Sequence, residues 1–179
     1  MEEPAIEKPV KQPAPKIDKS NAVNFHITDD ALGAGSAKEK FRRNIEAIRT
    51  LEKVESENRI ATRSEQHILS QYVGWGGLAS ARESSLNAHY TSPAIIRSIY
   101  DTLDRMGFEK GNVLEPAMGI GNFFGMLPEK MQESRLYGVE LDGITGRIAR
   151  QLYPKADIKI SGFEKTDYPN DFFDLAVGN

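Results

Sequence analysis

The sequence predicts an α/β fold in which an N-terminal helical segment precedes a partial parallel sheet. From Asn112 onward, short apolar runs alternate with segments of helical periodicity, a pattern typical of strands joined by crossover helices. A turn with two glycines, Gly119 and Gly121, follows the first run and opens a helical pattern. Because such crossovers are right-handed, we expect four strands in the spatial order 3-2-1-4, with the remaining strands of the sheet missing.

The composition describes a soluble globular protein. Of 179 residues, 39% are hydrophobic and 27% are charged, and the net charge of −3 is unusual for a stand-alone nucleic-acid-binding protein. Cys is absent and the three histidines are far apart, so we expect neither disulfides nor a metal site. No apolar run reaches transmembrane length and the N-terminus does not resemble a signal peptide. We therefore expect a cytoplasmic protein without membrane contact.

Three regions are predicted along the chain. Residues 1–23 contain four prolines among mixed charges and few large apolar side chains, so they are expected to form a disordered Pro-rich tail. Residues 24–87 are expected to form a helical N-terminal region. Residues 88–179 are expected to form the first half of the domain that contains the sheet.

Two helices are predicted in the helical region. Ser36-Ala-Lys-Glu39 forms a capping box, and apolar residues at helical spacing predict one apolar face that continues to about Val54: Phe41, Ile45, Ile48, Leu51 and Val54. The mixed charges of this helix indicate a solvated face, with a contact to the DNA backbone as the alternative. Ser64 is predicted to cap a second helix that runs to about Val73.

Two further segments lie close to the predicted boundary between the helical region and the sheet domain. Gly74-Trp-Gly-Gly77 is expected to end the second helix. We favour a buried Trp75 side chain that packs between the helical region and the sheet. The alternative places Trp75 at the rim of a nucleic-acid or cofactor site. Ser92-Pro93 predicts the start of a third helix, whose apolar stripe packs against the sheet and which Gly107 ends.

The sheet domain is expected to continue as four strands joined by helices. The strands are predicted near residues 112–116, 135–140, 158–161 and 172–177. The helix after the glycine turn is expected to reach about Met131, and a further helix to span about 143–152.

The residues around the glycine turn discriminate among nucleotide-like ligands. No Lys follows the glycines as in a phosphate-binding ATPase loop, and Phe124 stands where a dinucleotide fingerprint requires a third glycine. Glu115 precedes the turn and no Lys or Arg lies nearby, which disfavours a pyrophosphate and suits an ammonium or sulfonium group. Glu140, at the end of the second predicted strand, can accept hydrogen bonds from both ribose hydroxyls. These features favour S-adenosylmethionine over NAD, and a turn without any cofactor is the alternative.

The same residues resemble a known family. Val113–Phe123 (Val-Leu-Glu-Pro-Ala-Met-Gly-Ile-Gly-Asn-Phe) resembles the first motif of S-adenosylmethionine-dependent N6-adenine DNA methyltransferases. Glu140 with Asp142 resembles their second motif. Ala88–Pro93 resembles the threonine–proline motif that precedes the cofactor loop in this class. The matches around Glu115 and the glycine turn are the specific ones.

The resemblance implies a Rossmann-like methyltransferase sheet, S-adenosylmethionine as cofactor and DNA as a partner. The implied cofactor-binding positions are Thr91, Glu115, Pro116, Ala117, Gly119, Gly121, Asn122, Phe123, Glu140, Leu141, Phe163 and Glu164. Phe163 is expected to stack on the cofactor's adenine, with an ordinary core position as the alternative. Glu164 departs from the family's commonest third motif, because Gly162 stands where the acid often lies.

The resemblance also implies a catalytic residue, Asn179, where the family's Asn-Pro-Pro-aromatic motif begins. In that motif the Asn and Pro carbonyls accept hydrogen bonds from the adenine amino group, and the aromatic ring stacks on a flipped base. Positioning and electrostatics then drive the reaction without a metal. Only Asn179 of this motif is present. We therefore expect an N-terminal fragment of a longer enzyme that does not itself transfer methyl groups.

The leading part of the chain, Asn24–Leu78, is similar to the opening of very large methyltransferase–helicase fusion proteins of mobile elements. With the motifs above, the resemblance covers about residues 24 to 179. It implies covalently continuous downstream domains, a helicase among them, and DNA contacts through parts beyond this chain. Two alternatives stay open: a non-catalytic DNA-binding module of a helicase fusion, and a methyltransferase that acts on RNA or protein.

Overall fold

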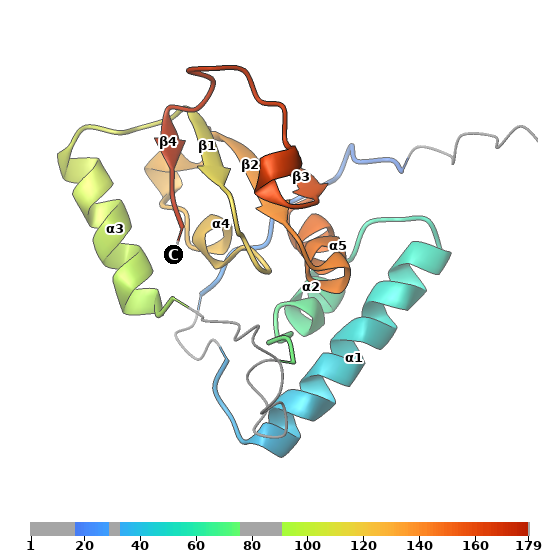
Figure 1. The fold of residues 1–179 in the computed structure, drawn as a ribbon. Helices are drawn as coiled ribbons and strands as arrows, with labels where there is room; N and C mark the ends of the chain where they lie inside the picture. The colour runs from blue at the N-terminus through green and yellow to red at the C-terminus, as the bar shows by residue number, and fades with distance from the viewer. Residues whose placement is uncertain (1–16, 29–32, 76–90, 179) are drawn as a thin grey trace, which may run out of the picture.

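The structure, a computed structural model, describes residues 17–28, 33–75 and 91–178 (Figure 1). Its helices are α1 (Ala37–Ser56), α2 (Arg63–Leu69), α3 (Pro93–Arg105), α4 (Asn122–Gly125) and α5 (Gly143–Leu152), with short 3-10 helices η1 (Glu129–Met131) and η2 (Phe163–Lys165). Its strands are β1 (Asn112–Glu115), β2 (Arg135–Glu140), β3 (Asp157–Ile160) and β4 (Leu175–Ala176). Most of the predicted tail and the segment 76–90 lie outside the described residues.

The four strands form one parallel sheet in the order β3-β2-β1-β4, which confirms the predicted fold class and strand order. Glu115 of β1 pairs in register with Gly138 of β2, and Glu140 of β2 pairs with Ile160 of β3. Because parallel strands end at the same edge, the two acidic residues lie on one edge of the sheet. The fold is therefore consistent with a Rossmann-like sheet.

Helices lie near both edge strands of this sheet, β4 and β3. Figure 1 shows α3 beside β4, and α1, α2 and α5 grouped near β3. Apolar side chains from α1, α2, α3, α5 and the sheet join one hydrophobic core, in which Leu51, Ile96 and Ile148 are fully buried. Within the described segments, every helix is too short or too polar to span a bilayer.

Buried amides connect the helical region to the sheet domain. The Gln66 side chain of α2 donates hydrogen bonds to the carbonyl oxygens of Gln151 and Leu152 at the end of α5, at 3.1 and 3.3 Å. In return the Gln151 side chain accepts a hydrogen bond from the Ala61 amide at 2.9 Å. An extended segment continues this connection, because the Phe25 amide donates to the Leu152 carbonyl at 2.7 Å.

Helix starts were predicted well where a single polar side chain sets them. Ser36 with Glu39 forms the predicted capping box of α1, and Ser92 caps α3. The second helix differs, because Thr62 rather than Ser64 caps it and it ends at Leu69. Thr62 forms its own capping box with Glu65, so the helix starts two residues before the predicted position.

Two predicted lengths in the sheet domain are wrong. The helix after the glycine turn ends at Gly125 instead of Met131, because Pro128 lacks an N–H and adopts an extended conformation. The fourth strand contains only Leu175–Ala176 rather than residues 172–177. Phe172 and Phe173 instead lie before the strand, and their rings pack on Tyr137, with centroids 5.1 and 5.5 Å from that of Tyr137.

Two expected core aromatics are exposed. Phe41 was placed on the apolar face of α1, yet it is 52% exposed because the buried face of that helix is formed by Asn44, Ala47, Leu51 and Val54. Trp75 is 39% exposed, and its ring lies 5.8 Å from that of Phe41. The prediction that Trp75 is buried between the helical region and the sheet is therefore wrong.

Candidate functional site

The two glycines of the turn after β1 have different structural requirements. Both adopt positive φ, 56° at Gly119 and 86° at Gly121, where side chains are strained. A Cβ on Gly121 would lie 2.5 Å from the ring of Tyr153, whereas a Cβ on Gly119 would meet nothing within 4 Å. Gly121 is therefore required for packing, and Gly119 leaves open space above the main chain.

Glu115 ends β1 below this turn and is almost completely buried, at 4% exposure. Its Oε2 has no hydrogen-bond partner among the residues that the structure describes. Burial, followed by the repulsion of nearby Glu140, raises the pKa of the Glu115 carboxyl well above its usual value. A buried carboxyl with an unsatisfied oxygen suits a cationic ligand group, since the cation would stabilise the ionised form.

Asn122 and Phe123 follow the turn at the start of α4. Asn122 is 9% exposed, and its Oδ1 is a second buried oxygen without a partner in the described part of the chain. Phe123 is buried, and its carbonyl oxygen accepts a hydrogen bond from the Tyr100 hydroxyl at 2.8 Å. Unsatisfied oxygens therefore lie on both sides of the glycine turn, at Glu115 and Asn122.

Glu140 connects the end of β2 to the turn. Its Oε2 accepts a hydrogen bond from the Gly119 amide at 2.8 Å, and its Oε1 accepts one from the Asp142 amide at 2.8 Å. These bonds hold the carboxylate beside the turn, and each oxygen keeps a further lone pair for a ligand. Asp142 in turn caps α5 by accepting a hydrogen bond from the Thr145 amide.

Two exposed apolar side chains follow the ends of β2 and β3. Leu141 is 69% exposed and Phe163, in η2, is 47% exposed, so Phe163 is not the ordinary core residue of the alternative interpretation. The Ser161 amide donates to the Glu140 carbonyl at 2.9 Å, which keeps the two strand ends together. Glu164 is exposed, and its carboxylate folds back over Gly162. Leu141 and Phe163 therefore offer exposed apolar surface at the sheet edge.

The remaining predicted positions surround this edge. Thr91 is partly exposed and precedes α3, whose first turn lies at the same end of the molecule as the carboxyl ends of the strands (Figure 1). Pro116 is half-buried and Ala117 is exposed. A Cβ on Gly178 would lie 3.6 Å from Pro116, so the chain after β4 passes beside the glycine turn. Asn179 lies outside the described residues.

Sequence reasoning did not identify the aromatic surroundings of Glu115. Tyr100 from α3 and Tyr153 after α5 are both buried, and in each burial, followed by the charge of Glu115, raises the pKa of the hydroxyl. Tyr153 also fills the space beside Gly121. A single aromatic residue at the end of a predicted helix gives no signal of such a contact, because the contact depends on tertiary packing.

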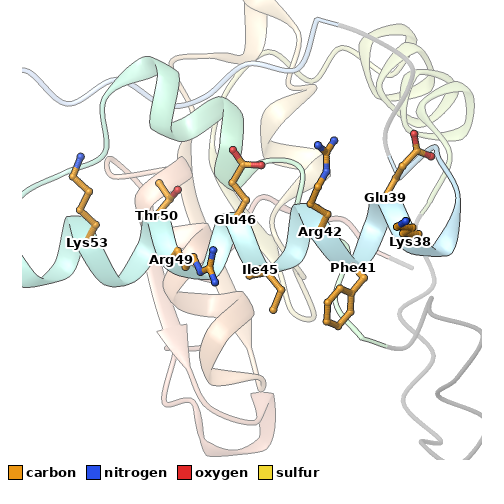
Figure 2. A pocket seen from close by; sticks show the side chains of 9 residues that line it. All are labelled: Lys38, Glu39, Phe41, Arg42, Ile45, Glu46, Arg49, Thr50 and Lys53. Carbon is orange, nitrogen blue, oxygen red and sulfur yellow. The ribbon is translucent and has the colours of Figure 1, made fainter.

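Other features of the described surface lie away from this edge. A hollow of about 950 Å³ runs along the exposed side of α1 (Figure 2). Two others include His26, one beside Met126 and Pro128 after α4 and one near the starts of β2 and β3. Among residues 17–28, 33–75 and 91–178, no three His, Cys, Asp or Glu side chains group as a metal site.

The parallel sheet, its glycine turn and the two acidic strand ends are consistent with a Rossmann-like α/β fold, and the carboxyl edge of the strands is its candidate ligand site. Among known proteins, no protein-family model matches the chain, and no solved structure matches it.

Two curated proteins are similar to this chain. It is 32% identical over 120 residues to the "Defense against restriction protein B" of Escherichia phage P1, a match that covers 66% of this chain and 5% of that protein. It is 34% identical over 101 residues to the "Type II methyltransferase M.CvrRI" of Paramecium bursaria Chlorella virus XZ-6E, covering 56% of this chain and 26% of that protein. The chain thus spans only a minor part of either relative, and these similarities support a methyltransferase-related family.

Proposed function

We propose that this chain is the S-adenosylmethionine-binding part of a DNA adenine-N6 methyltransferase within a larger methyltransferase–helicase protein. The observation that carries this proposal is the buried Glu115 carboxyl with an unsatisfied oxygen, next to the open main chain at Gly119 and across from Glu140. This arrangement suits a ligand with a cationic amino-acid end and a ribose.

Each part of the site matches one part of the donor. Glu115 would hold its ammonium group, the main chain at Gly119 would leave room for its methionine end, and Glu140 would accept hydrogen bonds from its ribose hydroxyls. The exposed side chains of Leu141 and Phe163 would supply apolar surface for its adenine. The donor supplies a methyl group activated by the positive charge on its sulfur.

The acceptor is assigned from sequence. One curated relative is named for defense against restriction and the other as a type II methyltransferase, and the first motif, Val113–Phe123, resembles that of N6-adenine DNA methyltransferases. We infer that the Asn179 side-chain oxygen accepts a hydrogen bond from the adenine amino group and orients its nitrogen towards the methyl group. The position of Gly178 supports this inference, because a Cβ added there would lie 3.6 Å from Pro116, so the chain before Asn179 passes close to the start of the turn.

Calorimetric titration with S-adenosylmethionine tests donor binding. We expect binding at one site, and Glu140→Ala should weaken it by about 1–3 kcal/mol because the ribose hydroxyls lose their acceptor. Glu140→Gln, which keeps one acceptor oxygen, should retain part of the affinity. Glu133→Ala is the matched control, because Glu133 is an exposed glutamate paired with Lys110 away from the strand ends. Tighter binding of NADH than of the donor, or an unchanged affinity in Glu140→Ala, would contradict the proposal.

Methyl transfer tests the acceptor. The polypeptide that carries this chain is incubated with isotope-labelled donor and DNA, and the modified nucleosides are identified by mass spectrometry. We expect N6-methyladenine, and we expect Asn179→Ala to abolish it while leaving donor binding intact. Label found in cytosine, in RNA or in protein would refute the adenine assignment.

A further inference from the structure

The exposed side of α1 combines positive charge with aromatic surface. We define its outer face as Lys38, Phe41, Arg42, Ile45, Arg49 and Lys53, which line the hollow of about 950 Å³ in Figure 2. These residues lie opposite the face that packs on the protein core. In Figure 2 the four cations are spaced along the helix, with Phe41 and Ile45 pointing to one side of it and Arg42 pointing to the other, beside Glu39 and Glu46.

Most of these cations are available to a ligand. No side-chain hydrogen bond or ion pair joins Lys38, Arg42 or Arg49 to another residue in the part of the chain that the structure describes. Lys53 lies 3.7 Å from Glu65. Two carboxylates share the hollow, Glu39 and Glu46, and Glu39 is held by the capping box at the start of α1. The outer face therefore carries an excess of positive charge on a chain whose net charge is −3.

An aromatic pair lies at one end of this face. The rings of Phe41 and Trp75 are 5.8 Å apart, and the two side chains are 52% and 39% exposed. Asn44, which is fully buried, fixes the chain that leads to Trp75. Its side chain accepts a hydrogen bond from the Val73 amide at 2.9 Å and donates one to the Gly74 carbonyl at 2.6 Å. Two exposed rings held against a helix by a buried amide form a preorganised apolar surface.

We propose that the outer face of α1 binds single-stranded DNA, with phosphates on the cations and an unpaired base stacked on the Phe41–Trp75 pair. Cationic side chains that follow a backbone, together with exposed aromatic rings, are the recurring elements of single-strand binding. Lys38 and Lys53 are 15 residues apart in the helix, which is about 22 Å and spans several nucleotides of an extended strand. A base inside a duplex has no free ring face for such stacking.

The choice of DNA over RNA rests on the function proposed above, whereas the surface itself is argued from α1 and Trp75 alone. The first turn of α1 lies towards the same end of the molecule as the carboxyl ends of the strands (Figure 1). A strand held there is at the end of the molecule where the donor site lies.

Trp75 provides a direct measurement, because it is the one Trp of the sequence. Titration of the whole chain with a short oligothymidylate should quench Trp75 fluorescence as bases stack on it, and the affinity should fall as salt is raised. The double variant Arg42→Ala/Arg49→Ala should bind about tenfold more weakly and with a shallower salt dependence. The matched control is Arg105→Ala/Lys110→Ala, which removes two exposed cations near the end of α3 and should bind as the parent chain does.

Several outcomes would overturn the proposal. They are the absence of quenching, equal binding of a duplex of the same sequence, tighter binding of the matching RNA, and equal losses in the Arg and control double variants. Phe41→Ala gives a second test, because it should reduce quenching while leaving the cations in place. Donor binding by calorimetry is measured on the same variants, so a failure of the donor site and a failure of this surface are distinguished.

Discussion

At the scale of single residues, the Glu115 carboxyl links stability to ligand binding. Burial, followed by the nearby Glu140, raises its pKa in the folded protein well above the ordinary value that the unfolded chain retains. Below the ordinary pKa, the protonated Glu115 carboxyl therefore makes its full contribution to the free energy of unfolding. This contribution is lost as pH rises through the raised pKa. A cation bound beside Glu115 would reverse this loss by stabilising the carboxylate.

Glu115→Gln tests this linkage. The amide cannot ionise, so the free energy of unfolding of the variant should fall less than that of the parent chain between about pH 5 and pH 8. The measurement is urea unfolding across that pH range, with Glu133→Gln as an exposed control. Parallel pH profiles for the parent chain and Glu115→Gln would show that Glu115 does not titrate as described.

At the scale of elements, the two glycines of the turn between β1 and α4 have different roles. Gly121 is required for packing, whereas Gly119 leaves space for a ligand. Gly119 and Gly121 both have positive φ, so alanine carries a similar backbone strain at either position, about 1–2 kcal/mol. Only at Gly121 does the added Cβ also collide with the buried ring of Tyr153.

The paired substitutions Gly119→Ala and Gly121→Ala should therefore give different results. Gly121→Ala should lower the free energy of unfolding by clearly more than Gly119→Ala, because overpacking adds about 1–3 kcal/mol to the backbone strain. Gly119→Ala should remain folded but lose donor affinity, because the methyl group enters the open space above the turn. Thermal unfolding and calorimetry together check both effects. Equal destabilisation of the two variants would contradict this assignment.

The sequence allowed local features of these elements to be predicted, and tertiary packing set the others. Ser36 and Ser92 identified two helix starts because a cap acts within one turn, and β2 was predicted at both bounds. The fourth strand was predicted too long because Phe172 packs on Tyr137, a contact between distant segments. The burial of Glu115 was likewise hidden, since burial depends on tertiary packing, which also brings Tyr100 of α3 and Tyr153 after α5 close enough for the charge of Glu115 to raise their pKa values.

At the scale of the whole molecule, the helical region and the sheet domain are tied by polar as well as apolar contacts. Gln66, 2% exposed, donates hydrogen bonds to the carbonyl oxygens of Val23, Gln151 and Leu152. These carbonyls belong to the leading segment and to α5, so one side chain joins three parts of the fold. We therefore expect the two regions to unfold together.

Gln66→Ala tests this coupling. Loss of the amide leaves buried carbonyl oxygens unsatisfied and should lower the free energy of unfolding by about 1–3 kcal/mol. Unfolding in urea, followed by the fluorescence of Trp75 in the helical region and by circular dichroism, should give coincident transitions in the parent chain. Gln132→Ala is the exposed control. Two separate transitions in the parent chain, or no loss of stability in Gln66→Ala, would contradict the coupling.

The most direct test of the central claim is a titration of isotope-labelled protein with S-adenosylmethionine, followed by backbone amide chemical shifts. We predict the largest changes at Gly119, Glu140, Leu141 and Phe163, which lie at or just after the carboxyl ends of β1, β2 and β3. Unchanged shifts at high donor concentration, or largest changes along α1 or around His26, would show that the donor does not bind at this edge.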